Sequence, residues 1–306
     1  MTTEPTALDP LLTEQVDERY GSIDTASVAE LAALMNDADA TVPGAVRGAL
    51  DQVVPAIEAI VDRLGAGGRL FYVGAGSAGR MGVLDAAECP PTFSTPPDMV
   101  QAILAGGPDA VRVAVEGAED DPDAGADAIA GRGVGPRDVV FGITASGRTP
   151  YVLGAVRAAR RRGAVTIGLS CNPNTPLSSI VDHAIEVPVG PEVVAGSTRL
   201  KAGTAQKLVL NMVSTIAMVR LGKTYGNLMV DVRITNAKLR DRALRIVQRV
   251  TGAPRPEAET ALETAGHDVK LAILLLDGSS TVEEARHRLV VRGGGRLRAA
   301  RESAKE

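Results

Sequence analysis

The sequence is poor in several kinds of residue, and each shortage excludes a class of protein. It has no tryptophan, and aromatic residues make up only 2% of its 306 residues, so a core has to be built from Ala, Val, Leu and Ile. Its two cysteines and three histidines show no metal-ligand or redox spacing. With a formal net charge of −4 it also lacks the basic field that attracts nucleic acid or anionic lipid. We therefore expect no metal site, no nucleic-acid partner and the reduced thiols of a cytoplasmic protein.

Signals for export or membrane insertion are also missing. The first residues, Met1 to Arg19, are polar and acidic and do not have the pattern of a signal peptide. The most apolar helical segment, Leu208 to Leu221, is interrupted by polar residues and is shorter than the roughly 20 residues that a membrane span needs. We expect a protein that is neither exported nor embedded in a membrane.

Short apolar runs alternate with helical patterns through most of the chain. Periodicity predicts two N-terminal helices, at Thr25 to Ala38 with Asp24 as N-cap, and at Pro43 to Leu64. Buried strands are predicted at Arg69 to Val73, Val100 to Leu104, Asp138 to Thr144, Ala164 to Leu169 and Ala184 to Val189. This alternation predicts a three-layer α/β/α fold with a five-stranded parallel sheet, whose ligands bind at the carboxyl ends of the strands.

Beyond about Arg240 the pattern changes to short helices broken by glycine and proline. These are predicted at Arg242 to Val250, Pro256 to Ala265, Val269 to Leu276 and Val282 to Val290. The chain is therefore expected to have a large domain, residues 1–240, and a small helical domain, residues 241–306. The charged stretch from Gly293 to Glu306 is expected to be a frayed tail.

The first strand runs into a glycine-rich turn, Gly74-Ala75-Gly76-Ser77-Ala78-Gly79-Arg80, where a helix begins. Small residues let backbone N–H groups approach a ligand, and the helix N-terminus and the Ser77 hydroxyl add to an anion site. The three glycines also fit a dinucleotide-binding G-x-G-x-x-G pattern, but no clear acidic residue follows about 20 residues later. Taken alone, the motif is equally well explained as a structural tight turn.

The third strand runs into a similar turn, Ala145-Ser146-Gly147-Arg148-Thr149-Pro150. It again offers hydroxyls, a glycine and the start of a helix. Two hydroxyl-rich turns on neighbouring strands suit one phosphate monoester better than a dinucleotide. The predicted phosphate contacts are Gly76, Ser77, Ser146, Gly147 and Thr149, with Arg148 as a further candidate.

Two more polar segments follow later strands. The turn from Ser170 to Pro176 can supply polar contacts or simply cap its neighbours. The segment from Glu192 to Thr204 leads into a long helix, and Ser197 or Thr198 is an obvious N-cap. Because this segment is expected near the same sheet edge, Glu192, Ser197, Thr198 and Lys201 are candidate contacts for a polyhydroxy ligand.

Several of these strings resemble a known family. The Ser146 to Thr149 turn and the Glu192 to Thr204 segment resemble the sugar isomerase (SIS) domain, a five-stranded parallel fold that binds phosphosugars. From about Thr13 to Leu239 the chain is similar to the N-acetylmuramic acid 6-phosphate etherase family. The strings that carry this resemblance are Gly74 to Arg80, Asp85 to Thr92, Ala118 to Asp121, Ala145 to Tyr151, Arg199 to Leu210 and Gly226 to Asp231. The final helical region resembles, more weakly, the small ubiquitin-associated-like (UBA-like) domain of that family.

The resemblance implies a lyase that removes the D-lactyl ether of N-acetylmuramic acid 6-phosphate with water, giving N-acetylglucosamine 6-phosphate and D-lactate. In the open-chain sugar the C1 aldehyde acidifies the C2–H bond, and the lactyl oxygen on C3 is β to the resulting carbanion. One base and one acid are enough for elimination and rehydration, so no cofactor is expected. A homodimer with a site completed across its interface and a role in cell-wall amino-sugar recycling are also implied.

Two glutamates, Glu88 and Glu119, match the catalytic pair of that family. Because Cys89 precedes Pro90, the helix is expected to stop at Glu88, where its dipole favours a protonated carboxyl and the role of general acid. Glu119 is assigned as the base that removes the C2 proton. Glu116 lies three residues before it, and the preference for Glu119 rests on the resemblance.

Two other functions fit the same domain. An aldose–ketose isomerase would also remove a proton beside a carbonyl but would release no lactate. A catalytically silent sugar-phosphate sensor, like the glucokinase regulatory protein, would bind without turnover. The presence of both glutamates favours the etherase, and the N-terminal helices show no basic face for reading DNA.

Overall fold

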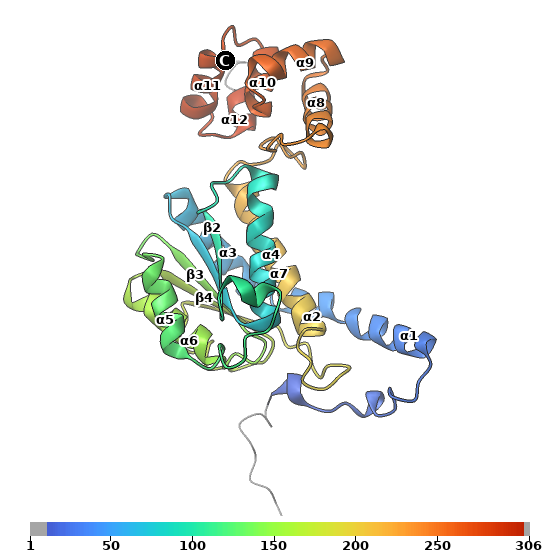
Figure 1. The fold of residues 1–306 in the computed structure, drawn as a ribbon. Coiled ribbons are helices and arrows are strands. Elements are labelled where there is room, and N and C mark those ends of the chain that lie inside the picture. The colour runs from blue at the N-terminus through green and yellow to red at the C-terminus, as the bar shows by residue number, and fades with distance from the viewer. Residues whose placement is uncertain (1–10, 303–306) are drawn as a thin grey trace, which may run out of the picture. The chain divides into compact units, whose positions relative to one another are not determined.

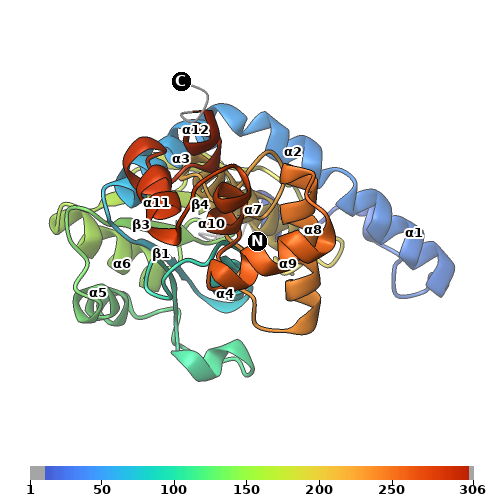
Figure 2. The ribbon, with the colours of Figure 1, turned by 90° about the horizontal axis from the view of Figure 1, so that it is seen from above.

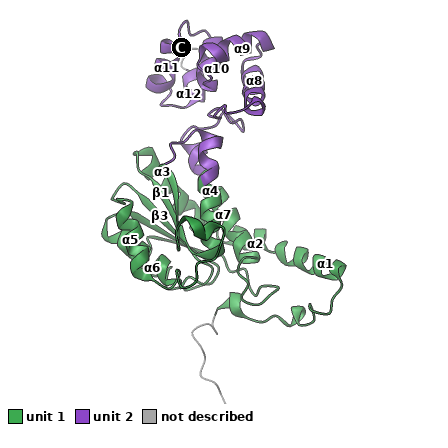
Figure 3. Ribbon diagram, viewed as in Figure 1, with its two compact units in different colours: residues 1–86, 98–214 green, residues 87–97, 215–306 purple. Residues whose placement is uncertain are grey.

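The computed structural model describes residues 11–302 and divides into two compact units (Figure 3). Unit 1 consists of Met1–Ala86 and Asp98–Ser214, and unit 2 of Ala87–Pro97 and Thr215–Glu306. Within the described residues no helix has the length and apolar character that crossing a membrane demands. The domain limits indicated by the sequence, 1–240 and 241–306, stay a prediction.

Unit 1 contains a sheet with helices before, between and after its strands (Figure 1). The strands are β1 (Leu70–Gly74), β2 (Val100–Leu104), β3 (Val139–Ile143), β4 (Val165–Ser170) and β5 (His183–Glu186). The helices are α1 (Val28–Asp39), α2 (Val42–Gly48), α3 (Leu50–Gly65), α5 (Pro122–Gly131) and α6 (Pro150–Arg161), with short 3-10 helices η1 (Leu12–Glu14), η2 (Glu18–Tyr20) and η3 (Pro108–Val111). Two long helices, α4 (Gly76–Phe93) and α7 (Lys201–Arg220), begin in this unit.

All five strands are parallel, in the order β2-β1-β3-β4-β5, which confirms the predicted sheet. From β1 the chain passes to β2 on one side and then returns to β3 on the other, so the strand order reverses between β1 and β3. Parallel sheets bind ligands at the carboxyl ends of the strands that flank such a reversal. The two predicted phosphate turns follow β1 and β3, so the topology places them next to each other.

Both faces of the sheet are covered, as alternate side chains of β1 show. Phe71 and Val73 point to one face, where they share a buried cluster with residues of α5 and α6. Tyr72 points to the other face, where its hydroxyl donates to Asp85 of α4 (2.9 Å) and Ser214 of α7 donates to the same carboxylate (3.0 Å). In Figure 1 these two pairs of helices lie on opposite sides of the strands, which confirms the three-layer fold.

Two glycines hold α5 and α6 at backbone contact distance. A β-carbon on Gly154 of α6 would stand 1.9 Å from the carbonyl oxygen of Pro122, and one on Gly125 of α5 would stand 2.0 Å from the carbonyl oxygen of Tyr151. Any larger residue at either position would overlap the neighbouring helix. The first turns of α5 and α6 therefore pack directly on each other.

The start of α1 differs from the prediction. The N-cap is Ser27, whose hydroxyl accepts from the backbone N–H of Glu30 (3.3 Å), while the Glu30 carboxylate accepts from the backbone N–H of Ser27 (2.7 Å). Asp24 has no glutamate three residues later to form such a capping box, which explains why the helix starts at Ser27 instead. The second predicted helix is divided at Ala49 into α2 and α3.

The end of α4 also differs, because the helix continues past Glu88 to Phe93 with Pro90 and Pro91 inside it. The predicted stop at Glu88 is therefore wrong. Cys89 and Phe93 are four residues apart on one face and are both buried, so packing maintains the last turn against the local preference of proline. Glu88 lies before the final turn, outside the short range over which a helix end acts on a charge.

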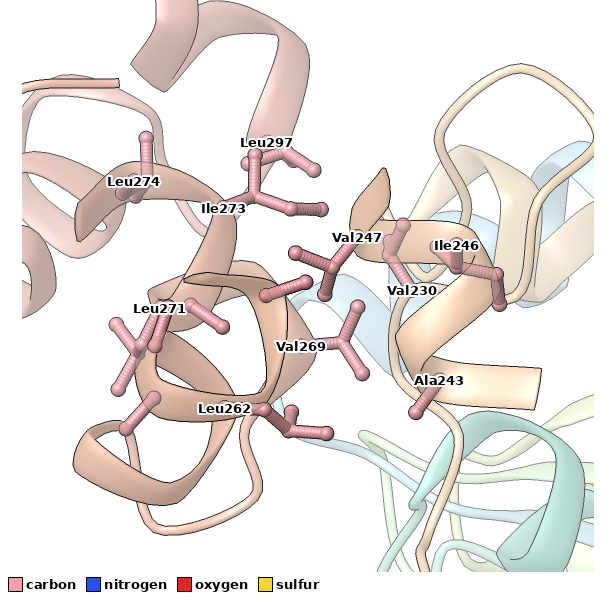
Figure 4. Packing of buried hydrophobic residues seen from close by; sticks show 14 of the residues in the cluster. Val230, Ala243, Ile246, Val247, Leu262, Val269, Leu271, Ile273, Leu274 and Leu297 are labelled. Atoms are coloured by element: carbon pink, nitrogen blue, oxygen red, sulfur yellow. The ribbon is translucent and has the colours of Figure 1, made fainter. Parts of the chain in front are cut away.

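Unit 2 is helical and has its own core. Its further elements are α8 (Ala237–Thr251), α9 (Arg255–Thr264), α10 (Val269–Leu276), α11 (Val282–His287), a π-helical turn at Arg288–Arg292 and α12 (Leu297–Glu302). Figure 4 shows Val247 of α8 and Val269 of α10 pointing toward each other in this core. The predicted helices of the C-terminal region are thus present, with Val269–Leu276 matching to the residue.

The predicted frayed tail from Gly293 to Glu306 is wrong over the residues that the structure describes. Leu297 and Ala300 of α12 are fully buried in the core of unit 2. Arg301 forms an ion pair with Asp277, with 2.6 Å between Nε and Oδ2. The burial of apolar side chains at helical spacing stabilises this segment as a helix despite its high charge. Residues 303–306 lie outside the described residues.

Candidate functional site

A cavity of about 310 Å³ opens at the carboxyl edge of the sheet in unit 1. It is lined by Glu14, Ala75, Gly76, Ser77, Ala78, Glu119, Thr144, Ala145, Ser146, Thr149, Thr198 and Gln206. Ser77 follows β1, whereas Ser146 and Thr149 follow β3. Both hydroxyl-rich turns therefore contribute to a single cavity, as their positions in the sequence predicted.

The glycines of the first turn allow close backbone packing at two positions and an open helix start at a third. Gly74 and Gly79 pack backbone against backbone, since a β-carbon on Gly74 would lie 2.7 Å from the Cα of Gly79. Gly76 has a φ of +52°, with no atom within 4 Å of the position that a β-carbon would take. Gly76 thus begins α4 with its backbone open to the cavity, where a helix N-terminus favours an anion.

Hydroxyl groups of the second turn form a connected row along the cavity wall. Thr144 Oγ1 lies 2.7 Å from Thr149 Oγ1 and 3.3 Å from Ser146 Oγ. Ser146 Oγ also accepts from the backbone N–H of Arg148 (3.2 Å). Gly147 has a φ of +69° and packs against a threonine of the turn after β4, where a β-carbon would overlap it. Gly147 thus shapes the turn, and neither it nor Arg148 lines the cavity.

Of the predicted contacts between Glu192 and Lys201, the structure places some at the cavity and others away from it. Glu192 is buried and accepts from the backbone N–H groups of Lys201 (2.9 Å) and Ala202 (3.0 Å), so it caps the start of α7. Burial raises the pKa of Glu192 and lowers that of Lys201, whose ammonium group donates to the carbonyl of Val189 (2.7 Å). Thr198 lines the cavity, whereas Glu192, Ser197 and Lys201 do not.

Glu119 stands on the cavity wall, in the loop before α5. Its backbone carbonyl accepts from the N–H of Tyr151 (3.0 Å), which ties this loop to the first turn of α6. Asp121 caps α5, with its Oδ1 accepting from two backbone N–H groups at 2.9 Å. Glu119 lines this cavity and a second, adjoining one, whereas Glu116 lines only the second. Glu119 is therefore better placed than Glu116 for a ligand that the two turns hold.

Two lining residues, Glu14 and Gln206, were missed from the sequence. The segment that carries Glu14 is attached to the sheet edge by Asn172, which donates to Thr13 Oγ1 (3.0 Å) from 159 residues away. Gln206 is 1% exposed, and its Nε2 has no hydrogen-bond partner among residues 11–302. A buried amide that borders a cavity and has no partner for its N–H groups is available to a ligand.

Glu88 lies on α4, eleven residues after Ser77, and its side chain is exposed. Eleven residues are close to three helical turns, so the two side chains project from the same face of this helix. Eleven residues also span about 16 Å along the helix axis. Glu88 lines neither cavity, and its role as the acid stays a prediction.

Comparisons with known proteins agree with these observations. The family model of the glucokinase regulatory protein N-terminal SIS domain matches residues 52–160, the SIS domain model matches residues 128–216, and the model of the C-terminal lid domain of glucokinase regulatory protein matches residues 226–291. The N-acetylmuramic acid 6-phosphate etherase of Rubrobacter xylanophilus is 58% identical over 293 residues, which cover 96% of this chain and 96% of that protein. The chain belongs to the N-acetylmuramic acid 6-phosphate etherase family.

A second member of the etherase family, from Streptomyces avermitilis, is 55% identical over 293 residues, covering 96% of this chain and 94% of that protein. Among solved structures, a phosphoheptose isomerase from Francisella tularensis is 20% identical with a TM-score of 0.51, over 64% of this chain and 100% of that chain. At this identity the likeness concerns the fold alone, and it confirms the predicted SIS-type fold. The UBA-like character of the C-terminal region stays a prediction.

Asp85, which precedes Glu88 by one helical turn in this etherase-family chain, is buried beside Tyr72 and Ser214. Burial raises its pKa from 3.8 to about 6, against the opposing effect of the hydrogen bonds from those two hydroxyls. The native state thus holds the Asp85 proton to a higher pH than the unfolded chain does. This group's contribution to the free energy of unfolding is greatest below pH 3.8 and declines as the pH rises to about 6.

We expect Asp85→Asn to remove that decline, because an amide stays neutral and can still bond to both hydroxyls. The free energy of unfolding of the variant relative to the wild type should rise by up to about 3 kcal/mol between pH 4 and pH 6. Urea unfolding at a series of pH values, followed by circular dichroism, measures the difference. Asp127→Asn, an exposed aspartate of α5, is the matched control. Parallel pH curves for wild type and Asp85→Asn would contradict the expectation.

Proposed function

We propose that this chain is a carbon–oxygen lyase that cleaves the D-lactyl ether of N-acetylmuramic acid 6-phosphate with water, giving N-acetylglucosamine 6-phosphate and D-lactate. The observation that carries the proposal is the single cavity in which two hydroxyl-rich turns meet Glu119, in a chain 58% identical to a protein named for this activity.

The two turns are suited to hold the 6-phosphate. Gly76 and Ser77 present the N-terminus of α4, whose dipole favours negative charge, and Ser146 and Thr149 add hydroxyl donors from the other turn. In this proposal Gly147 and Arg148 shape the second turn. The capping bonds of Glu192 and the buried ammonium of Lys201 position α7, and Thr198 replaces Ser197 as the hydroxyl that faces the ligand.

With the phosphate held there, the remaining task is proton transfer at C2 and at the lactyl oxygen. We propose that the Glu119 carboxylate takes the C2 proton of the open-chain sugar, whose C1 aldehyde stabilises the carbanion. The electron pair then forms the C2–C3 double bond as the C3–O bond breaks, and Glu88 donates a proton to the departing lactate oxygen. Because Glu88 lies about three turns of α4 from Ser77, we propose that a second copy of the chain supplies it. Glu88 next removes a proton from water as its oxygen bonds to C3, and Glu119 returns a proton to C2. Atoms and charges balance over the two steps without a cofactor.

We further propose that the enzyme is a homodimer, and α1 supports this. Of its twelve residues only Ala38 is buried, while Val28 is 84% exposed and Met35 is 40% exposed. Figures 1 and 2 both show α1 extending away from the other elements of unit 1. A helix whose apolar side chains stay exposed among residues 11–302 is suited to pack on a second copy. Sedimentation equilibrium should give twice the chain mass of 31.6 kDa, and a mass of one chain would reject the dimer.

A cytoplasmic location and a role in cell-wall amino-sugar recycling follow as proposals from the same reaction. A sugar phosphate does not cross a membrane unaided, so the enzyme that consumes it belongs where the phosphate was added. Cys89 and Cys171 are buried and form no disulfide, which suits a reducing compartment. Cell fractionation should recover the protein with cytoplasmic markers, and recovery with exported proteins would contradict this location.

Incubation of the purified protein with N-acetylmuramic acid 6-phosphate tests the proposed reaction. It should release D-lactate and N-acetylglucosamine 6-phosphate in equal amounts, without added metal or nucleotide. An isomerase would convert a phosphosugar without lactate, and a silent sensor would bind the substrate without changing it. Either result would reject the etherase.

A further inference from the structure

A second cavity, of about 240 Å³, adjoins the first one. The two share Ala75, Gly76 and Glu119, so they meet at the proposed base. The rest of the second cavity is formed by Arg80, Ala105, Ala110, Ala114, Val115, Glu116, Gly117 and Ala118. Most of this wall consists of small, mainly apolar residues, and one residue brings a positive charge.

That residue, Arg80, is the only lysine or arginine that lines either cavity in the described part of the chain. Its Nε donates to the backbone carbonyls of Ala110 (3.1 Å) and Val111 (3.0 Å), which fixes the plane of the guanidinium group. Its two terminal nitrogens make no hydrogen bond or ion pair with residues 11–302. An arginine held through Nε keeps the planar pair of donors with which arginine binds a carboxylate in bidentate geometry.

Arg80 is the one positive charge among several carboxyl groups on the walls of the two cavities, as far as the described residues show. Glu14, Glu116 and Glu119 bring three carboxyl groups to the cavity walls. The substrate of the proposed function carries a phosphate and also the carboxylate of its lactyl group. The hydroxyls and backbone N–H groups of the two turns can receive the phosphate, but they leave the lactyl carboxylate near Glu119 and Glu116 without a positive partner.

We propose that the second cavity is the lactyl subsite, in which the terminal nitrogens of Arg80 bind the lactyl carboxylate and the alanine and valine side chains contact its methyl group. This inference rests on the proposed function. The sugar then occupies the first cavity and the lactyl group the second, so the C3–O bond that breaks lies where they meet, beside Glu119. Arg80 is thereby a specificity-determining residue that selects a 2-oxyacid ether over an uncharged ether.

The competing role for Arg80 is phosphate binding, since Ser77 lies three residues earlier in the first turn of the same helix. Two substrates of nearly equal shape separate the two roles. One is N-acetylmuramic acid 6-phosphate, and the other is its lactyl carboxamide, which keeps the phosphate and loses only the carboxylate charge. A phosphate contact affects both substrates equally, whereas a carboxylate contact affects only the first.

The experiment compares kcat/KM of wild type, Arg80→Met and Arg80→Lys on both substrates. Arg80→Met should lose roughly 10- to 100-fold on the acid, which corresponds to a charged hydrogen-bonded pair, and less than about 3-fold on the carboxamide. Arg80→Lys should fall between wild type and Arg80→Met, because it keeps the charge without the bidentate geometry. Arg112→Met is the matched control, since Arg112 is exposed and lines neither cavity.

Product inhibition gives a second readout that a merely structural role would not produce. D-lactate should inhibit the wild type and lose this inhibition in Arg80→Met, while inhibition by N-acetylglucosamine 6-phosphate stays unchanged. Equal losses on acid and carboxamide, or unchanged D-lactate inhibition, would overturn the lactyl subsite. If the wild type cleaves neither substrate, the proposed function fails instead, so the two failures are distinguishable.

Discussion

Glu119→Gln is expected to stop the exchange of the C2 proton of N-acetylglucosamine 6-phosphate with solvent deuterium. An amide cannot accept the proton that the carboxylate takes, and loss of a general base typically costs about 10²- to 10⁴-fold in rate. D-lactate release from the substrate should therefore fall by a similar factor. Proton nuclear magnetic resonance in deuterated water follows the exchange, and an enzymatic lactate assay follows the cleavage.

Glu116→Gln provides the comparison for this result, because Glu116 lies three residues away and lines only the second cavity. It should retain C2 exchange within about a factor of ten of the wild type. If exchange instead continues in Glu119→Gln and stops in Glu116→Gln, the base is Glu116. Thermal unfolding of both variants would show whether either change disturbs the fold, and neither should, since both side chains are exposed.

Glu88→Gln is expected to separate the two proton transfers. Without the acid, the lactyl oxygen leaves unprotonated, so D-lactate release should fall by about 10²- to 10⁴-fold. Exchange at C2 of N-acetylglucosamine 6-phosphate should continue, because Glu119 is still present. The measurement is the ratio of exchange rate to lactate release, which rises strongly in this variant and not in Glu119→Gln.

A matched control for Glu88→Gln is Glu58→Gln, which changes an exposed glutamate of another helix, α3. It should keep both rates. Full lactate release by Glu88→Gln would remove Glu88 from the mechanism, and loss of exchange together with release would assign it to the base instead of the acid.

The sheet and the meeting of the two hydroxyl-rich turns in one cavity were predictable because their signals are local. The run Val100–Leu104 is bounded by polar and turn residues, and it forms a strand over the same five positions. Ser77, Ser146 and Thr149 each follow a predicted strand directly, and a parallel sheet brings the carboxyl ends of its strands to one edge. These three residues line the cavity, which the sequence indicated without knowledge of the strand order, and their role as phosphate contacts stays a prediction.

The features that the sequence did not indicate depend on tertiary contacts, some of them between distant segments of the chain. Glu14 reaches the cavity because Asn172 binds Thr13, and no pattern around position 14 indicates a partner 159 residues away. Gln206 sits within a regular helix, where only burial shows that its amide borders a cavity. The end of α4 was misplaced because buried Cys89 and Phe93 outweigh Pro90. Local rules for helix ends do not include such packing.

The backbone contact between α5 and α6 connects the proposed phosphate site to the proposed base. The second turn leads directly into α6, and the Tyr151 N–H at the start of α6 binds the carbonyl of Glu119. Gly154 and Pro122 then fix the first turns of the two helices against each other. We expect this set of contacts to fix the distance between the proposed phosphate site and Glu119, and so how far a sugar must extend from its phosphate for C2 to meet the carboxylate. We therefore expect selection for the length of the sugar to depend on a helix pair whose residues do not line the cavity.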